Sequence, residues 1–244
     1  MNLRNKLRPI ALATSMALAS MAAPLAAHAD VTGNISVVSQ YILRGITNAP
    51  ENPNATLQGG FDWSGDSGLY AGYWGSTLGY NNGDPSYGDG FENDLYVGYA
   101  GGSTVKYSIG VIQYMYMNLT DSNGAEIAGT LGYGPLTLGA KYLTKDVVWG
   151  NKGDIYWTLG YSTDLPKDFS LSATAGYYTY KDSGKYIAST PKSGNFRHLD
   201  VTLSHPIAKT GATMNVTYTV GGKDRNEVEQ HNAIVFGIGY NFGI

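Results

Sequence analysis

Charged side chains are sparse in this chain, and those that could do chemistry recur in alternating segments. Only 14% of the 244 residues are charged, against roughly 25% in an average soluble domain. Several alternate with apolar residues and are predicted to share an interior lining: Arg44, Asp62, Glu92, Asp94, Lys106, Glu126, Lys141, Asp154 and Asp200. Such charges can set the ion preference of a pore or hold a structure together as ion pairs.

The pattern gives little support for catalysis or metal binding. His198 and Asp200 stand two residues apart and could orient a general base, but no serine is linked to them by local sequence. Cysteine is absent and the histidines are scattered, so neither a disulfide nor a zinc site is predicted. We therefore expect no catalytic residue, no cofactor and no metal.

The N-terminus has the pattern of a secretory signal peptide. An apolar stretch over residues 10–23 follows a basic segment, and Ala27-His28-Ala29 offers the small residues that signal peptidase reads. We predict export by the Sec pathway, cleavage of residues 1–29 and a single domain over residues 30–244. An uncleaved anchor is the alternative, but the apolar stretch is shorter than the ~20 residues of a spanning helix.

Cleavage makes the chain more acidic. It removes three of the 16 basic residues and none of the 19 acidic ones, which leaves a net charge of −6. A chain of this charge has no basic footprint for nucleic acid, so no nucleic-acid partner is expected.

Beyond residue 30 the dominant pattern is an apolar alternation of period two, which is typical of half-buried strands. The first such segment contains Ile35, Val37, Tyr41 and Leu43, and the third has Leu69, Ala71 and Tyr73 against a rival stripe of Tyr70 and Trp74. The last is the clearest, with one face formed by Ile234, Phe236, Ile238, Tyr240, Phe242 and Ile244. Twelve segments of this kind predict twelve strands.

The connections between these segments alternate between short turns and longer polar loops. An even number of strands with this alternation is the pattern of an antiparallel transmembrane β-barrel, an all-β fold with one apolar and one polar face. Aromatic residues near the strand ends predict girdles at the membrane interfaces: Tyr41, Trp63, Tyr99, Tyr133 and Tyr161.

Several segments of the first third of the mature chain resemble the TorF-type family of porins. They are Ser39-Gln40-Tyr41-Ile42-Leu43-Arg44-Gly45-Ile46, Gln58-Gly59-Gly60-Phe61-Asp62, Gly68-Leu69-Tyr70-Ala71-Gly72-Tyr73-Trp74-Gly75-Ser76 and Asn93-Asp94-Leu95-Tyr96-Val97-Gly98-Tyr99. The resemblance implies a bacterial outer-membrane barrel that acts as a porin. It departs at the C-terminus, which ends on Ile244 where many such barrels end on an aromatic residue.

The predicted interior favours a channel for small polar solutes or ions. Small or polar residues alternate inward in the second half of the chain: Thr137, Gly139, Thr158, Gly160, Ser170, Ser172, Thr174, Gly176, Thr213, Asn215, Thr217, Gly237 and Gly239. Glycine could instead merely relieve strain in a curved sheet. With Arg44 as the main opposing charge, the acids near the outer mouth predict a mild cation preference.

Two other functions stay open at this point. A non-conducting structural or adhesive barrel would have the same strands, and so would a barrel enzyme of the lipase or protease type. The expected location is the outer membrane of a Gram-negative bacterium. The expected partners are outer-membrane lipid, the barrel-assembly machinery and periplasmic chaperones.

Overall fold

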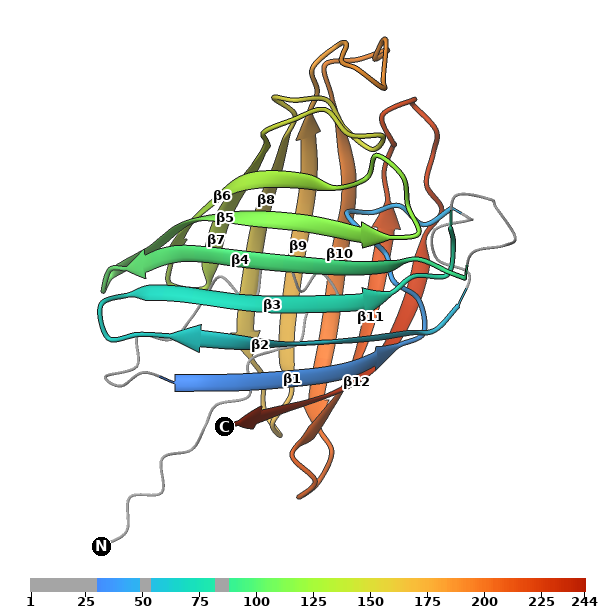
Figure 1. The fold of residues 1–244 in the computed structure, drawn as a ribbon. Helices are drawn as coiled ribbons and strands as arrows, with labels where there is room; N and C mark the ends of the chain where they lie inside the picture. The colour runs from blue at the N-terminus through green and yellow to red at the C-terminus, as the bar shows by residue number, and fades with distance from the viewer. Residues whose placement is uncertain (1–29, 49–53, 82–87) are drawn as a thin grey trace, which may run out of the picture.

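Twelve antiparallel strands close into a barrel in the computed structural model, which describes residues 30–48, 54–81 and 88–244 (Figure 1). The strands are β1 (Asp30–Val38), β2 (Thr56–Ser64), β3 (Leu69–Thr77), β4 (Phe91–Gly101), β5 (Val105–Met117), β6 (Gly124–Tyr133), β7 (Leu136–Leu143), β8 (Ile155–Asp164), β9 (Ser170–Thr179), β10 (Gly194–Pro206), β11 (Ala212–Gly221) and β12 (Ala233–Gly243). The predicted signal peptide lies outside the described residues.

The barrel closes because β12 pairs with β1 in a continuous register from Thr32↔Gly243 to Val38↔Gly237. Every other strand pairs with its neighbours in the sequence. The twelve-stranded fold predicted from the sequence is therefore confirmed. Among the described residues, no helix is long and apolar enough to cross a membrane.

The connections form two different rims. The short-turn rim, where β12 ends beside the start of β1, is made of residues 65–68, 102–104, 134–135, 165–169 and 207–211 (Figure 1). The long-loop rim is made of residues 39–55, 78–90, 118–123, 144–154, 180–193 and 222–232, of which 49–53 and 82–87 are not described. The predicted alternation of connection lengths is thus present.

The outer face of the barrel is a continuous apolar surface, to which each of the twelve strands contributes. On β12 the exposed residues are Ile234, Phe236, Ile238 and Tyr240, while Val235 is buried inside, as the period of two predicts. On β3 the ambiguity is settled, because Leu69 is exposed and Tyr70 and Trp74 point into the barrel. Trp63, Tyr99, Tyr133 and Tyr161 are exposed aromatic residues near the short-turn rim, as expected for a girdle.

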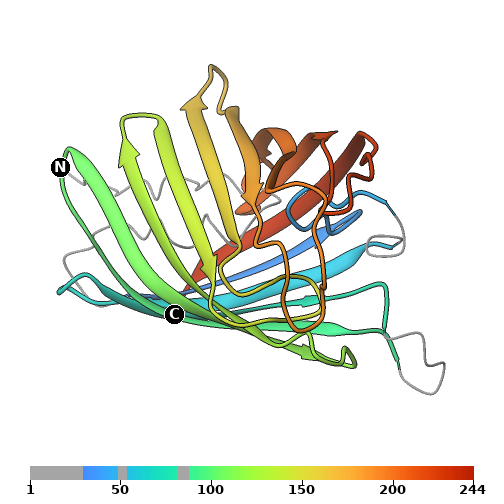
Figure 2. The same ribbon diagram turned by 90° about the horizontal axis from the view of Figure 1, so that it is seen from above.

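The interior is asymmetric. The strands β9 to β12 contribute small polar residues that the sequence predicts, such as Ser172, Asn215 and Thr217. The strands β3 to β5 instead direct bulky side chains inward, among them Tyr114 and Ile112. Figure 2 shows the strands that enclose this interior from above. The bulky side chains of β3 to β5 therefore occupy more of the interior than a lining of small residues would.

The first strand is shorter than predicted, and two expectations about it are wrong. The strand ends at Val38, where the backbone N–H of Ser39 donates to Phe236 O and the Ser39 hydroxyl accepts from Phe236 N–H. Tyr41 is therefore not a girdle residue on the outer face but is buried inside the barrel. Arg44 faces inward as expected, yet from a loop with a positive φ of 50° and not from a strand.

The apolar stripe of β12 yields a prediction about assembly. Phe236→Asp, like Phe242→Asp, should block insertion, because a charge on the lipid face of a barrel costs roughly 2–4 kcal/mol for a basic side chain and somewhat less for an acidic one. Asn241→Asp, on the inward face of the same strand, is the matched control and should assemble. Heat-modifiable barrel recovered from outer membranes measures both. Normal levels of the Phe236 variant would contradict the assignment of the outer face.

Candidate functional site

The segment that follows β1, residues 39–48, folds into the barrel and is called the inner loop here. Tyr41 packs on Trp74 of β3, with ring centroids 5.8 Å apart, and its hydroxyl donates to Glu92 of β4 over 3.0 Å. Ile42 packs with Val38 and Val235, where β1 meets β12. The inner loop therefore joins two sides of the wall through the bore.

Arg44 is the residue by which the inner loop reaches the far wall. Its guanidinium makes two hydrogen bonds to Glu126 of β6, Nη1–Oε1 of 2.8 Å and Nη2–Oε2 of 2.7 Å. It also donates to the hydroxyls of Tyr178 and Tyr114 and lies 4.8 Å from the ring centroid of Tyr156. The two charged side chains are only 9% and 1% exposed, so this is a buried, bidentate ion pair.

Gly45 allows the inner loop to lie against β10. Its φ is +77°, and a Cβ there would lie 2.6 Å from the carbonyl oxygen of Arg197 and 2.7 Å from Cβ of His198. Only glycine meets both demands. Two residues further on, the backbone N–H of Thr47 donates to Oε1 of Gln230 in the β11–β12 loop. The inner loop thus touches the barrel all around the bore.

The acidic side chains of β4 differ in how well they are satisfied. Glu92 is 1% exposed and accepts from the hydroxyls of Tyr41 and Tyr116. Asp94 is 3% exposed, and its Oδ1 has no hydrogen-bond partner among the described residues. Lys141 of β7 is equally buried and forms no ion pair within 4.0 Å there. Two charges inside the outer half of the barrel are thus left without direct partners.

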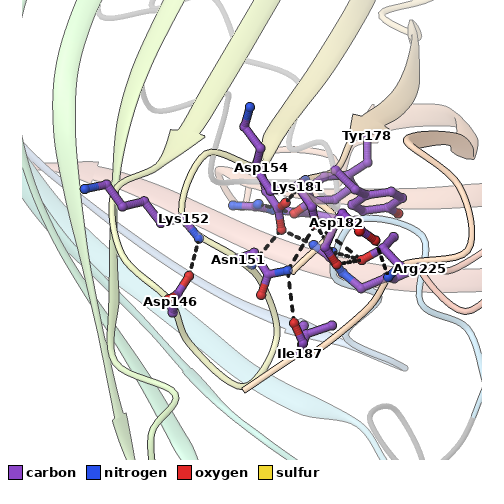
Figure 3. Close-up of polar contacts among 12 residues, drawn as sticks. Asp146, Asn151, Lys152, Asp154, Tyr178, Lys181, Asp182, Ile187 and Arg225 are labelled. Atoms are coloured by element: carbon purple, nitrogen blue, oxygen red, sulfur yellow. Dashed lines mark hydrogen bonds and ion pairs between the residues drawn. The ribbon is translucent and has the colours of Figure 1, made fainter. Parts of the chain in front are cut away.

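Asp154, at the start of β8, ties three rim loops together (Figure 3). It accepts from the backbone N–H groups of Asn151 and Lys181, at 2.8 and 2.7 Å, and forms an ion pair with Arg225 of the β11–β12 loop. Asn151 Nδ2 donates in turn to Lys181 O over 3.0 Å. Asp154 is therefore a structural residue of the mouth and not a free lumen charge.

Asp146, a half-buried residue of the same rim, has a similar role. The backbone N–H groups of Lys152 and Lys185 donate hydrogen bonds to its carboxylate, at 2.7 and 3.0 Å. These bonds, the one from Lys152 first, hold the pKa of Asp146 below its ordinary value. The negative charge of Asp146 thus helps to order the loops at neutral pH.

His198 and Asp200 form a buried polar relay. His198 is fully buried, with Nε2 2.6 Å from the Tyr156 hydroxyl and Nδ1 3.1 Å from Oδ2 of Asp200, although the latter contact lacks hydrogen-bond angles. Asp200 accepts from Thr219 over 2.7 Å. The ring of Tyr156 lies against the Arg44 guanidinium. By holding the Tyr156 hydroxyl, His198 and Asp200 therefore help to position the side chain that supports the Arg44–Glu126 ion pair.

The remaining predicted lining residues lie elsewhere. Asp62 of β2 accepts from the hydroxyl of Tyr96 at 2.5 Å. Lys106 is exposed near the short-turn rim. The structure therefore brings together a subset of the predicted residues at the outer mouth: Arg44, Glu92, Asp94, Glu126, Lys141 and Asp154.

Sequence parity missed two cations at this level. The register of β10 shifts between Phe196 and His198, and this bulge turns Arg197 inward, where it is 4% exposed. Arg225 comes from a loop, for which parity makes no prediction. With Arg44 and Lys141, these two arginines make four cations at the outer mouth, where Asp224 joins the predicted acids Glu92, Asp94, Glu126 and Asp154. The cation preference expected from the sequence stays a prediction.

A cavity of about 610 Å³ lies above the inner loop at the long-loop rim. Its charged lining residues are Arg44, Arg197, Arg225, Glu92, Asp94 and Asp224. Most of the remaining lining is aromatic or aliphatic, so the cavity combines polar and apolar surfaces. We call it the outer cavity.

The sequence matches the model of a family described as bacterial protein of unknown function (Gcw_chp), over residues 22–242. The chain belongs to this family. The family description does not carry the TorF name. No curated protein matches the sequence.

Solved structures similar to this Gcw_chp chain are outer-membrane barrels. The KdgM porin is 9% identical, over 87% of this chain and 99% of that chain, with a TM-score of 0.54. The COG4313 outer membrane channel from Pseudomonas putida F1 is 10% identical, over 92% and 98%, with a TM-score of 0.53. The Salmonella typhi outer membrane phospholipase is 14% identical, over 85% and 88%, but its TM-score of 0.45 carries no argument. These identities show the fold alone.

The Arg44–Glu126 pair yields a prediction about the inner loop. In Glu126→Gln the buried guanidinium loses its counter-charge, which costs about 3–5 kcal/mol when one partner of a buried pair is removed. The backbone N–H groups of Ile46 and Thr47 should then exchange with solvent roughly 100-fold faster or more, since each 1.4 kcal/mol is tenfold.

Hydrogen exchange of the refolded barrel measures this effect. Glu229→Gln is the matched control, because its carboxylate is exposed at the rim and, within the described part of the chain, forms its ion pair with Lys223 and not with the inner loop. Equal exchange rates at Ile46 and Thr47 in both variants would show that the ion pair does not hold the inner loop.

Proposed function

We propose that this protein is an outer-membrane porin of a Gram-negative bacterium, through which small polar solutes or ions diffuse passively. The observation that carries the proposal is the combination of an apolar outer surface on all twelve strands with a polar, charged interior. An apolar surface of this extent is unfavourable in water but matches the hydrocarbon of a bilayer. A closed barrel also leaves no unpaired strand edge in lipid.

The segments that resemble TorF-type porins support the same function, as does the secretory pattern of residues 1–29. In this proposal the chain crosses the inner membrane by the Sec pathway, and periplasmic chaperones and the barrel-assembly machinery insert it. The short-turn rim would face the periplasm and the long-loop rim the exterior.

The inner loop is the constriction of the proposed channel. Strand side chains fill an eight-stranded barrel, but the wider bore of twelve strands needs a further element to narrow it. The inner loop spans that bore at the level of Glu92 and Glu126, and the outer cavity lies on its outer side. Solutes would have to pass the inner loop at this level.

Conductance in planar bilayers tests the proposal. Refolded protein, with folding verified by heat-modifiability and insertion by flotation with liposomes, should produce small discrete current steps in KCl. Inserted barrel without current steps would favour the non-conducting structural or adhesive alternative. Lipid hydrolysis by the same sample would instead favour a barrel enzyme.

The constriction yields its own prediction. If the inner loop narrows the bore, Glu126→Gln should raise the single-channel conductance or its fluctuation, because the loop loses its ionic anchor on β6. Glu229→Gln should leave the recordings unchanged. The proposal would be contradicted if hydrogen exchange showed that the inner loop is released in Glu126→Gln but the conductance equalled that of the parent protein. The narrowest level of the bore would then lie elsewhere.

A further inference from the structure

Arg197 is a buried cation whose charge is not compensated. Its Nε donates to the carbonyl oxygen of Arg44 at 3.2 Å, and its Nη1 donates to the carbonyl oxygen of Lys223 and, at 3.4 Å, to the hydroxyl of Tyr180. Among the residues that the structure describes, no carboxylate lies within 4.0 Å of it and no hydrogen bond involves Nη2. A buried charge without a counter-charge is costly, so an anion from solution would be stabilised there.

The position of Arg197 makes such an anion accessible. The residue is 4% exposed, yet it lines the outer cavity, which opens to the exterior rim. The other two arginines of the cavity are already neutralised, Arg44 by Glu126 and Arg225 by Asp154. Among the described lining residues, Arg197 is therefore the arginine that has no carboxylate partner, and its Nη2 can donate to a ligand.

The rest of the lining selects the body of the ligand. Aromatic and aliphatic side chains surround the charged groups: Tyr41, Leu78, Tyr114, Tyr116, Leu119 and Trp149. A small inorganic anion would leave these surfaces in contact with water, whereas a ring or hydrocarbon body would cover them. A guanidinium also suits the planar geometry of a carboxylate.

The charge of the ligand is limited by the opposite wall. Glu92 and Asp94 line the cavity from β4, which lies six strands from the β10 of Arg197 in the twelve-stranded ring, and Asp224 lines it from the β11–β12 loop. Arg197 can offset one negative charge of a ligand, and a second negative charge would face these three acids without a partner. A monoanion is thus favoured over a phosphate ester, which carries about −1.5 to −2 charges.

We propose that the outer cavity is a binding site for small organic monocarboxylates, with the carboxylate on Arg197 and the apolar body against the aromatic wall. The inference rests on the proposed channel function and adds its solute class. Binding in the cavity can be measured whether or not the barrel conducts, so the two proposals fail separately.

Isothermal titration calorimetry on the refolded, full-length mature barrel at low salt tests the site. Benzoate is the probe, with benzamide, benzylammonium and phenyl phosphate as ring-matched comparisons. Benzoate should bind about tenfold or more tighter than benzamide and benzylammonium, since a hydrogen bond to a charged group contributes roughly 1.5–3 kcal/mol. Equal binding of benzamide, tighter binding of phenyl phosphate, or no binding of benzoate would each overturn the proposal.

A variant series tests the assignment to Arg197. Arg197→Gln keeps a donor for the backbone carbonyls but removes the charge, and benzoate affinity should fall about tenfold or more. Lys152→Gln removes an exposed rim cation that does not line the cavity, and should bind as the parent does. Unchanged affinity in a folded Arg197→Gln barrel would overturn the proposal. If that variant does not fold, the comparison of benzoate with benzamide on the parent protein still decides.

Discussion

The pairing of β1 with β12 is the constraint on which the rest of the structure depends. Without it, the sheet would have two open edges inside an apolar surface, where unpaired N–H and C=O groups have no partner. Once the sheet is closed, each strand has one face outside the barrel and one face inside it. Alternate residues along a strand therefore belong to the apolar outer surface or to the polar interior. The closing seam is itself packed, since Phe242 of β12 meets Phe61 of β2 edge to face across Gly33, where any side chain would collide with the Phe242 ring.

Closure also creates the problem that the inner loop solves. Twelve strands enclose a wider bore than eight strands do, and the interior contains charges that need partners. Arg44 satisfies Glu126 from the opposite side of the barrel because it projects from a loop that has already entered the bore. Two tyrosine hydroxyls accept hydrogen bonds from the Nη atoms of Arg44, and the ring of Tyr156 lies against the guanidinium. The inner loop brings Arg44 to Glu126, and the ion pair in turn holds the inner loop inside the bore.

The sequence predicts the strands well and the mouth poorly, for one physical reason. Side chains alternate between two faces only while the ladder of backbone hydrogen bonds is regular. Leu69 and Phe236 lie within regular ladders and face outward as predicted. Tyr41 lies beyond the end of β1, Arg197 lies at a bulge and Arg225 lies in a loop, so the period of two says nothing correct about them. A bulge depends on the register of two strands that are distant from the local sequence, which no single segment reveals.

The segment Ser39–Ile46, which carries the first of the porin-like motifs, is also the segment that enters the bore. Each of its special residues has a physical task there: Ser39 ends the ladder on β12, Tyr41 binds Glu92, Arg44 binds Glu126, and Gly45 permits contact with β10. Gly45 in turn sets the Arg44 carbonyl against the Nε of Arg197, a residue that lines the outer cavity. The proposed constriction and the candidate anion site are therefore built by the same few residues, so a solute bound at Arg197 would contact the inner loop.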